Sequence, residues 1–235
     1  MKQLFSGIQA VPVYAMLFLC TILMALLADR TATAIWETAS LSRRHCIIID
    51  AGHGGEDGGA TSCAGILESQ YNLEIALRLD KLFHLLGYKT KMIRTGDYAI
   101  HTEGETIAAR KASDLKERVR IANSTENALL ISIHQNYFSQ CQYSGAQVFY
   151  PGSQGSESLA KTLQKTVKET LNPGSNRQAK KAAGIYLMEH ISCPGVLIEC
   201  GFLSNPQEEA KLRSSEYQKL LSAVIASAVS GYFLT

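Results

Sequence analysis

The chain has 235 residues, of which 46% are hydrophobic and 19% are charged, and its formal net charge is +2. This length is enough for one sizeable hydrophobic core, but it is short for two independent domains beside a membrane segment. Nucleic-acid binding favours a clear basic surplus on one face, so the nearly balanced charge predicts no nucleic-acid partner.

Near the N-terminus, residues 11–27 form an apolar stretch that contains no charged side chain. We interpret residues 1–34 as an N-terminal membrane segment or a signal peptide, and residues 35–45 as a linker. The small-residue pattern ATA at 32–34 favours cleavage, whereas the length of the apolar stretch favours a retained anchor. Both alternatives predict an extracytoplasmic protein, either membrane-anchored or secreted.

The chain contains six cysteines, and no two of them form a C-x-x-C pair of the kind that structural zinc sites favour. We expect them to be small buried residues. The sequence leaves open whether any two form a disulfide. They are Cys20, Cys46, Cys63, Cys141, Cys193 and Cys200.

One globular domain is expected over residues 46–235, and it opens with the sequence CIIIDAGHGGEDGGA. The run of isoleucines predicts a buried strand over 46–50, and the glycines that follow permit backbone angles that other residues rarely adopt. His53 should therefore lie just beyond the carboxyl end of this strand, where open α/β sheets usually bind ligands. The loop lacks the spacing of a phosphate-binding P-loop.

In the rest of the domain, segments with the helical period of about 3.6 residues alternate with short apolar runs that are typical of buried strands. This alternation predicts an α/β three-layer domain with a mostly parallel central sheet of about six strands flanked by helices. The charged residues of the second helix are expected to form a solvated face. Helices are predicted at 67–86, 107–123 and 159–171, with one or two at 208–233, and further strands at 88–93, 128–134, 146–150, 184–188 and 196–198.

Four side chains in this pattern could carry chemistry. His53, His134 and Glu199 each follow an apolar strand, and Glu68 opens the first helix. Two imidazoles and a carboxylate form the ligand set of a hydrolytic zinc site, and a second carboxylate could act as a general base. A structural role remains open for each residue taken alone. The remaining histidines lack this context and are interpreted as structural: His45, His84, His101 and His190.

Four sequence blocks, IIIDAGHGG, LESQYNLEIALRL, LLISIHQN and GVLIECGFLSNPQE, resemble the zinc-dependent N-acetylmuramoyl-L-alanine amidases of the Amidase_3 type. The resemblance runs from about Cys46 to the C-terminus. It implies that His53, Glu68 and His134 bind Zn²⁺ and that Glu199 is the catalytic acid/base. The implied reaction is hydrolysis of the amide bond between N-acetylmuramic acid and L-alanine in peptidoglycan.

This sequence departs from the family pattern at a few positions. Ala51 stands where the family usually has proline, and Cys200 replaces an aliphatic residue. Gln135 and Tyr137 replace small residues on either side of Asn136, which we interpret as a substrate-binding residue. None of these departures removes an implied zinc ligand, but the last two would reshape the substrate groove.

Within the family, the stretches RVRIANSTENALLISIH, SGAQVFY and IYLMEHISCPGVLIECGFLSNP are most similar to the sporulation- and germination-specific amidases. This similarity implies a role in forming the muramic lactam of the spore cortex, in the space between the forespore membranes. Two alternatives stay open: a vegetative or prophage lytic amidase of the same family, and an inactive peptidoglycan-binding scaffold with this fold.

Control of the enzyme is the last question that the sequence addresses. Division-linked members of the family block the zinc site with a segment inserted after the strand of the second histidine. Here only residues 137–144 separate that strand from the next, which is too short for a helical plug. We therefore expect control by expression, by location or by an activating protein partner, besides contacts with peptidoglycan and, through the N-terminal segment, the membrane.

Overall fold

The computed structural model describes residue 16 and residues 18–24 and 45–233. Residues 16 and 18–24 are helical, and none of the helices within the described ranges is both long and apolar enough to cross a membrane. Most of the predicted membrane segment or signal peptide, its cleavage pattern and nearly all of the linker lie outside the described residues. The predictions for residues 1–34 and 35–45 therefore stay predictions.

A six-stranded sheet forms the centre of the domain, in the order β2-β1-β3-β6-β4-β5. Strands β2, β1, β3 and β6 run parallel, whereas β4 pairs antiparallel with β6 and carries β5 at its outer edge. This arrangement confirms the mostly parallel sheet that the sequence predicts. The strands are β1 (Cys46–Ala51), β2 (Lys89–Met92), β3 (Ala128–Asn136), β4 (Gln147–Tyr150), β5 (Lys180–Lys181) and β6 (Gly195–Phe202).

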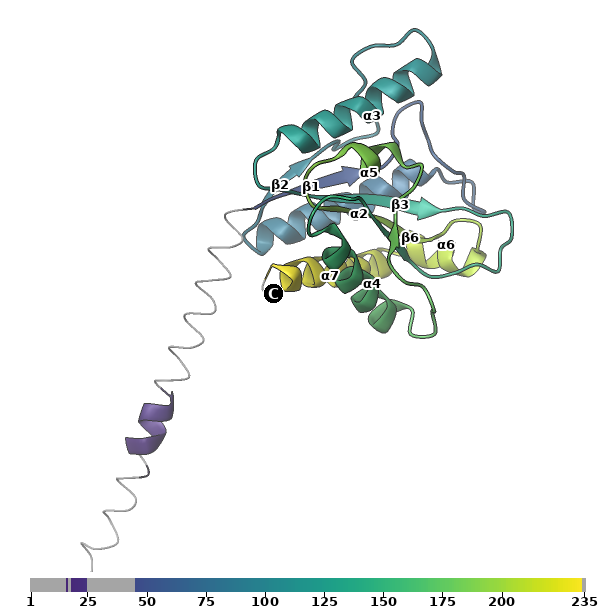
Figure 1. Ribbon diagram of the computed structural model, residues 1–235. Helices are drawn as coiled ribbons and strands as arrows, with labels where there is room; N and C mark the ends of the chain where they lie inside the picture. Colours follow the sequence, from purple (N-terminus) through teal and green to yellow (C-terminus); the bar gives the residue numbers. More distant parts are fainter. Residues whose placement is uncertain (1–15, 17, 25–44, 234–235) are drawn as a thin grey trace, which may run out of the picture. The chain divides into compact units, whose positions relative to one another are not determined.

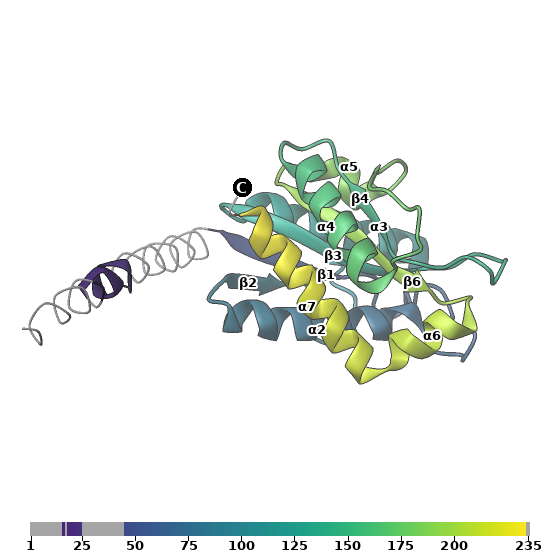
Figure 2. The ribbon, with the colours of Figure 1, turned by 90° about the horizontal axis from the view of Figure 1, so that it is seen from below.

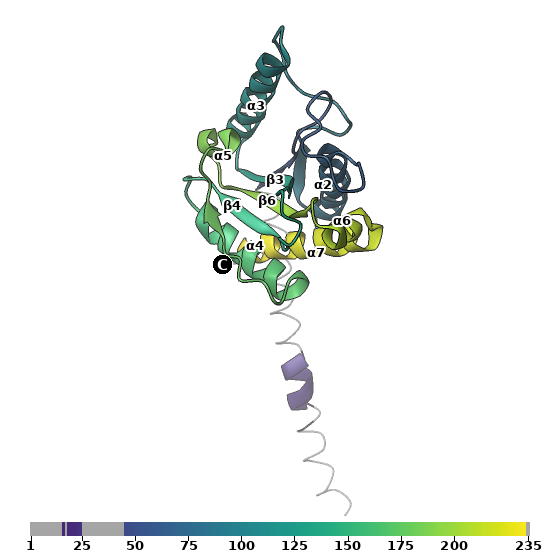
Figure 3. The ribbon, with the colours of Figure 1, turned by 90° about the vertical axis from the view of Figure 1, so that its right-hand side faces the viewer.

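Helices cover both faces of the sheet, which confirms the three-layer architecture (Figures 1 and 3). One face packs against α2 (Glu68–Leu85), α4 (Ser156–Leu171) and α7 (Ser215–Tyr232), with α7 lying between the other two (Figure 2). The opposite face packs against α3 (Ile107–Ser124) and the short α5 (Tyr186–His190). The remaining helix, α6 (Pro206–Arg213), follows β6 and contacts α7.

Alternation along the strands divides the core between these two faces. Ile47 and Ile49 of β1 face the larger apolar core with α2, α4 and α7, whereas Ile48 joins the smaller core beneath α3 and α5. Helix α2 begins at Glu68 and ends before Gly87, whose φ of 83° suits a glycine after a helix. The crossover from β1 through α2 to β2 thus brings the start of α2 to the carboxyl edge of the sheet, where β1 and β3 end.

Two sequence-based interpretations of this part of the chain are wrong. Residues 184–188 form no strand, because α5 turns Leu187 and Met188 into the core beneath α3, and the edge strand is the exposed pair Lys180–Lys181. Helix α3 is also not simply a solvated charged face. Asp114 and Arg118 are buried, and Arg118 is paired with Asp114 and with Asp50 of β1.

The cysteines are all free thiols. The expectation that they are buried holds for Cys200 alone. Two cysteines, Cys46 and Cys193, are partly buried, and the exposed ones are Cys20, Cys63 and Cys141. In the connection between β3 and β4, residues 137–146, all of which the structure describes, form turns and no helix. This connection therefore contributes no helix that could cover the cluster, while control of the enzyme stays a prediction.

Candidate active site

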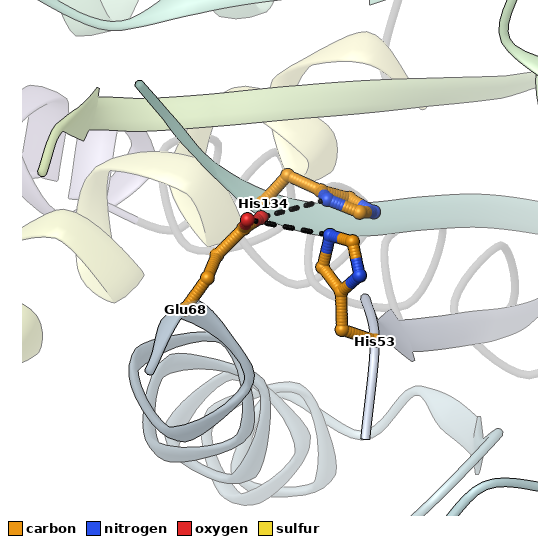
Figure 4. Close-up of side chains that lie close together, drawn as sticks. All are labelled: His53, Glu68 and His134. Carbon is orange, nitrogen blue, oxygen red and sulfur yellow. Dashed lines mark hydrogen bonds and ion pairs between the residues drawn. The ribbon is translucent and has the colours of Figure 1, made fainter. Parts of the chain in front are cut away.

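Three of the predicted site residues meet at the carboxyl edge of the sheet (Figure 4). One possible ligand atom from each of His53, Glu68 and His134 lies within 4.8 Å of the other two. Glu68 reaches between the imidazoles, with its Oε2 at 3.3 Å from His53 Nε2 and its Oε1 at 3.0 Å from His134 Nδ1. The residues come from the loop just after β1, the first turn of α2 and the last residues of β3.

Glycines make this convergence sterically feasible. A Cβ atom on Gly52 would lie 2.2 Å from His134 Cε1 and Nε2, so no side chain can occupy this position while the imidazole keeps its place. Gly59 has a φ of 68°, and a Cβ atom there would lie 2.6 Å from Glu68 Oε2. The glycine-rich loop therefore lets the backbone pass directly beside two of the three clustered side chains.

The Glu68 carboxylate is held by backbone as well as by side-chain donors. Oε2 accepts from Ala60 N at 3.1 Å, and Oε1 accepts from Gln135 N at 3.1 Å and from Asn72 Nδ2 at 3.3 Å. Burial raises the pKa of Glu68, but hydrogen bonds with His134 and His53 and their charges outweigh it and hold the pKa well below its usual range. Glu68 is therefore a fixed negative charge at the centre of the cluster.

Asp57 is a residue whose place the sequence did not reveal. The chain turns back between Gly54 and Asp57, and Asp57 Oδ2 lies 2.9 Å from His53 Nδ1 and 3.0 Å from Lys111 Nζ. Burial lowers the pKa of His53, but hydrogen bonds with Asp57 and Glu68 raise it to about 9. His53 itself has a φ of 62°, a left-handed backbone conformation that is costly for a residue with a side chain.

Glu199 lies next to His134, because the two residues are direct partners in the parallel pairing of β3 with β6. It sits within β6 and not at the end of the strand as the sequence suggested, because β6 continues to Phe202. Among the described residues Glu199 Oε2 is buried without a hydrogen-bond partner, and burial raises the pKa of Glu199 to about 7. Asn136, the predicted substrate-binding residue, is the last residue of β3 and is partly buried beside Phe202.

The cluster fits a divalent cation with oxygen and nitrogen ligands. A permanent carboxylate stands between two imidazoles, and the high pKa of His53 reflects the pull of two carboxylates for a positive charge at this point. A cavity of about 100 Å³ opens onto His53 and His134 between α3 and α5, with Lys111 and Tyr186 on its walls. Two histidines and a glutamate with space for a water molecule match the protein ligands of catalytic zinc sites.

Comparison with known proteins identifies the class. Residues 47–231 match the family described as N-acetylmuramoyl-L-alanine amidase (Amidase_3), so the chain belongs to this family and is an N-acetylmuramoyl-L-alanine amidase. It is 39% identical over 201 residues to the germination-specific N-acetylmuramoyl-L-alanine amidase of Bacillus subtilis strain 168, with 84% of each chain covered. The amidase LytC of the same strain is 28% identical over 80% of this chain and 35% of its own length.

The fold agrees with solved structures of amidases. The CwlD amidase from Clostridioides difficile, solved in complex with the GerS lipoprotein, superimposes with a TM-score of 0.77 and 36% identity over 80% of this chain and 98% of its own. An N-acetylmuramoyl-L-alanine amidase from Clostridium difficile 630 gives a TM-score of 0.71 and 30% identity over 83% of this chain. The sequence-based family assignment is therefore confirmed.

Proposed function

We propose that this amidase is zinc-dependent and that His53, Glu68 and His134 hold the metal. The observation that carries this proposal is the buried Glu68 carboxylate shared by two imidazoles. A second carboxylate lies beside them, that of the partly buried Glu199, whose Oε2 atom is buried. The substrate is the amide bond between the lactyl group of N-acetylmuramic acid and L-alanine of the stem peptide. Hydrolysis releases the peptide and leaves the glycan intact.

We assign the role of general base and acid to Glu199, the strand partner of His134. When bound, zinc supplies polarisation of the amide carbonyl and activation of water. Glu199 accepts a proton from the attacking water and transfers it to the nitrogen of the departing L-alanine. Asp57 fixes the orientation of His53 through Nδ1, and Asn136 contacts the substrate at the edge of the site.

The biological setting that we propose is formation of the muramic lactam in the spore cortex, between the forespore membranes. The similarity to a germination-specific amidase supports this role over that of a vegetative or prophage lytic amidase. The CwlD amidase, with which this fold aligns, was solved with a lipoprotein, so we also propose an activating lipoprotein partner for this chain. The N-terminal segment would hold the enzyme at the same membrane.

Digestion of purified peptidoglycan by the full chain, in mild detergent and with stoichiometric zinc, tests the reaction. Mass spectrometry should identify free stem peptides that begin with L-alanine and intact glycan strands. Glycan fragments or cleavage inside the peptide would contradict the proposed substrate bond. A spore former that lacks the gene should make cortex without muramic lactam, whereas a lytic amidase would leave the lactam content unchanged.

Two variants test the residue roles. Glu199→Gln should keep the zinc and lose amide cleavage by a factor of about 100 or more, because Gln cannot accept the proton. His134→Ala should lose the zinc in elemental analysis. Glu216→Gln and His84→Ala are matched controls, since both side chains are exposed, and they should keep zinc and activity. Near-normal turnover by Glu199→Gln would transfer the acid/base role to another carboxylate, with Asp57 the first to test.

A further inference from the structure

Arg94, which follows β2 closely, is the largest fully buried side chain of the described residues, with 0% exposure. Its guanidinium donates four hydrogen bonds, and all four acceptors are backbone carbonyl oxygens. Buried arginines more commonly face carboxylates, and carbonyl groups alone compensate a buried charge less well. We therefore attribute to this guanidinium a structural task, which is to fix the relative position of the backbone segments that it joins.

The acceptors lie next to two of the clustered side chains. Arg94 Nε donates to Ala51 O at 2.8 Å, and Nη2 donates to Gly52 O at 3.0 Å, in the two residues before His53. The same Nη2 donates to Ser69 O at 2.8 Å, in the residue after Glu68. One rigid, planar group thus connects the backbone that carries His53 with the first turn of the helix that carries Glu68.

On the side of β1 that faces β2, no described strand pairs with the last two residues of β1. Pairing between β1 and β2 stops at Ile49 and Met92, so β2 offers no strand partner to the last carbonyl of β1. Arg118 completes the support from α3, because its Nη1 donates to Ala51 O at 3.0 Å and its Nη2 to His53 O at 2.8 Å. Arg94 and Arg118 thus donate hydrogen bonds to the carbonyl oxygens of three successive residues, 51–53. These residues lead into the left-handed backbone conformation of His53.

We propose that Arg94 is a positioning residue of the metal centre, which fixes the spacing of His53 and Glu68 and thereby sets the affinity for zinc. This proposal rests on the proposed function, because it assumes that these two residues bind the metal. Outer contacts that orient metal ligands typically contribute a factor of about 10 to 100 in metal affinity. Arg94 contributes through the backbone of the ligands and not through their side chains.

Arg94→Lys separates positioning from simple support of the fold. Lysine keeps the positive charge, but its three donors radiate from one nitrogen. It therefore lacks the planar fork with which Arg94 reaches four carbonyl oxygens from three nitrogens. Arg78→Lys is the matched control, because Arg78 also joins two elements, α2 and α7, through bonds to Gln218 and Ser215 away from the site. Zinc dissociation constants by chelator competition, and unfolding by urea in EDTA, are measured for both variants in the full chain.

Arg94→Lys should bind zinc at least about tenfold more weakly than the wild type, and the visible absorption bands of its Co²⁺ form should change. Arg78→Lys should bind zinc as the wild type does, even if it unfolds more easily. Equal zinc affinity in Arg94→Lys, or an equal loss in Arg78→Lys, would overturn the positioning role alone. A wild-type protein that binds no zinc would overturn the proposed function, and this role with it.

Amide hydrogen exchange in the wild type provides a test that does not depend on whether Arg94→Lys folds. If Arg94 fixes the ligands in advance, the amides of Gly52 and Ser69 should exchange slowly both with zinc and in EDTA. Exchange that becomes rapid at both positions when zinc is removed would mean that the metal holds these segments together. That result would overturn the proposal.

Discussion

The two faces of the central sheet are built from the same strands but differ in their chemistry. Towards α2, α4 and α7 the strands present mostly apolar side chains, such as Ile47, Ile131 and Ile198. Two exceptions, Thr90 and Gln135, hydrogen-bond to side chains of α2. On the opposite face the apolar residues Ile48 and Leu130 are followed along their strands by polar ones, among them Asp50 and His134. Alternation along a strand thus lets one face serve mainly to stabilise the fold, while the other contributes side chains to the cluster at its carboxyl edge.

Asp50 illustrates how the polar face tolerates buried charge. It forms an ion pair with Arg118, which also binds Asp114 Oδ2 at 2.5 Å, and it accepts from Ser132 Oγ at 2.6 Å. Burial raises the pKa of Asp50, but the charge of Arg118 and the hydrogen bond from Ser132 outweigh it and lower the pKa. Each charged group of this network has a partner, so removal of one group leaves another buried charge unpaired. The free energy of unfolding should then fall by far more than the intact network contributes to it.

Breaking this network should give the largest stability effect on the polar face. Arg118→Met leaves the buried Asp50 without a cation, and we expect the free energy of unfolding to fall by about 3–5 kcal/mol. Urea unfolding in EDTA at pH 7 measures this change. Arg120→Met on the exposed side of the same helix is the control and should change stability by less than about 0.5 kcal/mol.

The pH dependence of this contribution follows from the lowered pKa of Asp50. A carboxyl group with a lowered pKa in the folded state stabilises the protein above its ordinary pKa, and the contribution disappears as the pH falls through the folded value. In Arg118→Met the cation is absent and burial raises the pKa of Asp50 instead, so the variant loses stability as the pH rises through that raised value. The difference between wild type and Arg118→Met should therefore be largest at pH 8 and shrink as the pH falls and Asp50 takes up a proton. A difference that grows towards acid would implicate another group.

The apolar face should respond with stability alone. Leu163 of α4 is fully buried in the larger core, and Leu163→Ala should lower the free energy of unfolding by about 2–5 kcal/mol. Because α4 contributes no residue to the cluster, zinc affinity should stay within twofold of the wild type. Chelator competition measures this, and a parallel loss of zinc affinity would mean that the two faces are not independent.

The sequence predicted the apolar face better than the polar one. Runs such as IIID and ALLISIH identify buried strands because burial on both faces leaves a local pattern, and the residues at their ends predicted His53 and His134. The roles of Asp114 and Arg118 could not be predicted in this way. A charged residue on a helix looks solvated unless its partner is known, and that partner, Asp50, lies 68 positions away from Arg118.

Asp57 and α5 were missed for related reasons. The approach of Asp57 to His53 depends on a tight return of the glycine loop, which leaves no periodic signal. In α5, a single helical turn is too short to be distinguished from a strand by alternation, and Leu187 and Met188 are buried in either interpretation. Long periodic elements were therefore predictable, whereas contacts made across turns and between distant elements were not.

The smallest effect that we predict is also the one that separates function from stability most directly. Glu199 is partly buried, its Oε2 is buried without a hydrogen-bond partner, and burial raises the pKa of Glu199 to about 7. A carboxyl group whose pKa is raised on folding stabilises the folded state only while it is protonated, so this contribution is complete below its ordinary pKa and is lost as the pH rises through about 7. Zinc-free wild-type protein should therefore lose stability between pH 5 and pH 8.

Glu199→Gln should remove the part of this loss that Glu199 causes, because Gln has nearly the same shape and cannot ionise. The raised pKa of His53 causes a further loss above its ordinary value, and this part should remain in both proteins. In EDTA the variant and the wild type should unfold alike at pH 5, and at pH 8 the variant should be more stable by up to about 3 kcal/mol. Urea unfolding at the two pH values measures the difference, with Glu216→Gln as an exposed control. A variant that is less stable than the wild type at pH 8 would contradict the assignment of a buried, uncompensated charge.

Bound zinc favours the ionised carboxylate, so adding the metal should reduce the advantage of the variant at pH 8. The residue that we expect to be indispensable for turnover is thus one that the metal-free fold tolerates only at a cost.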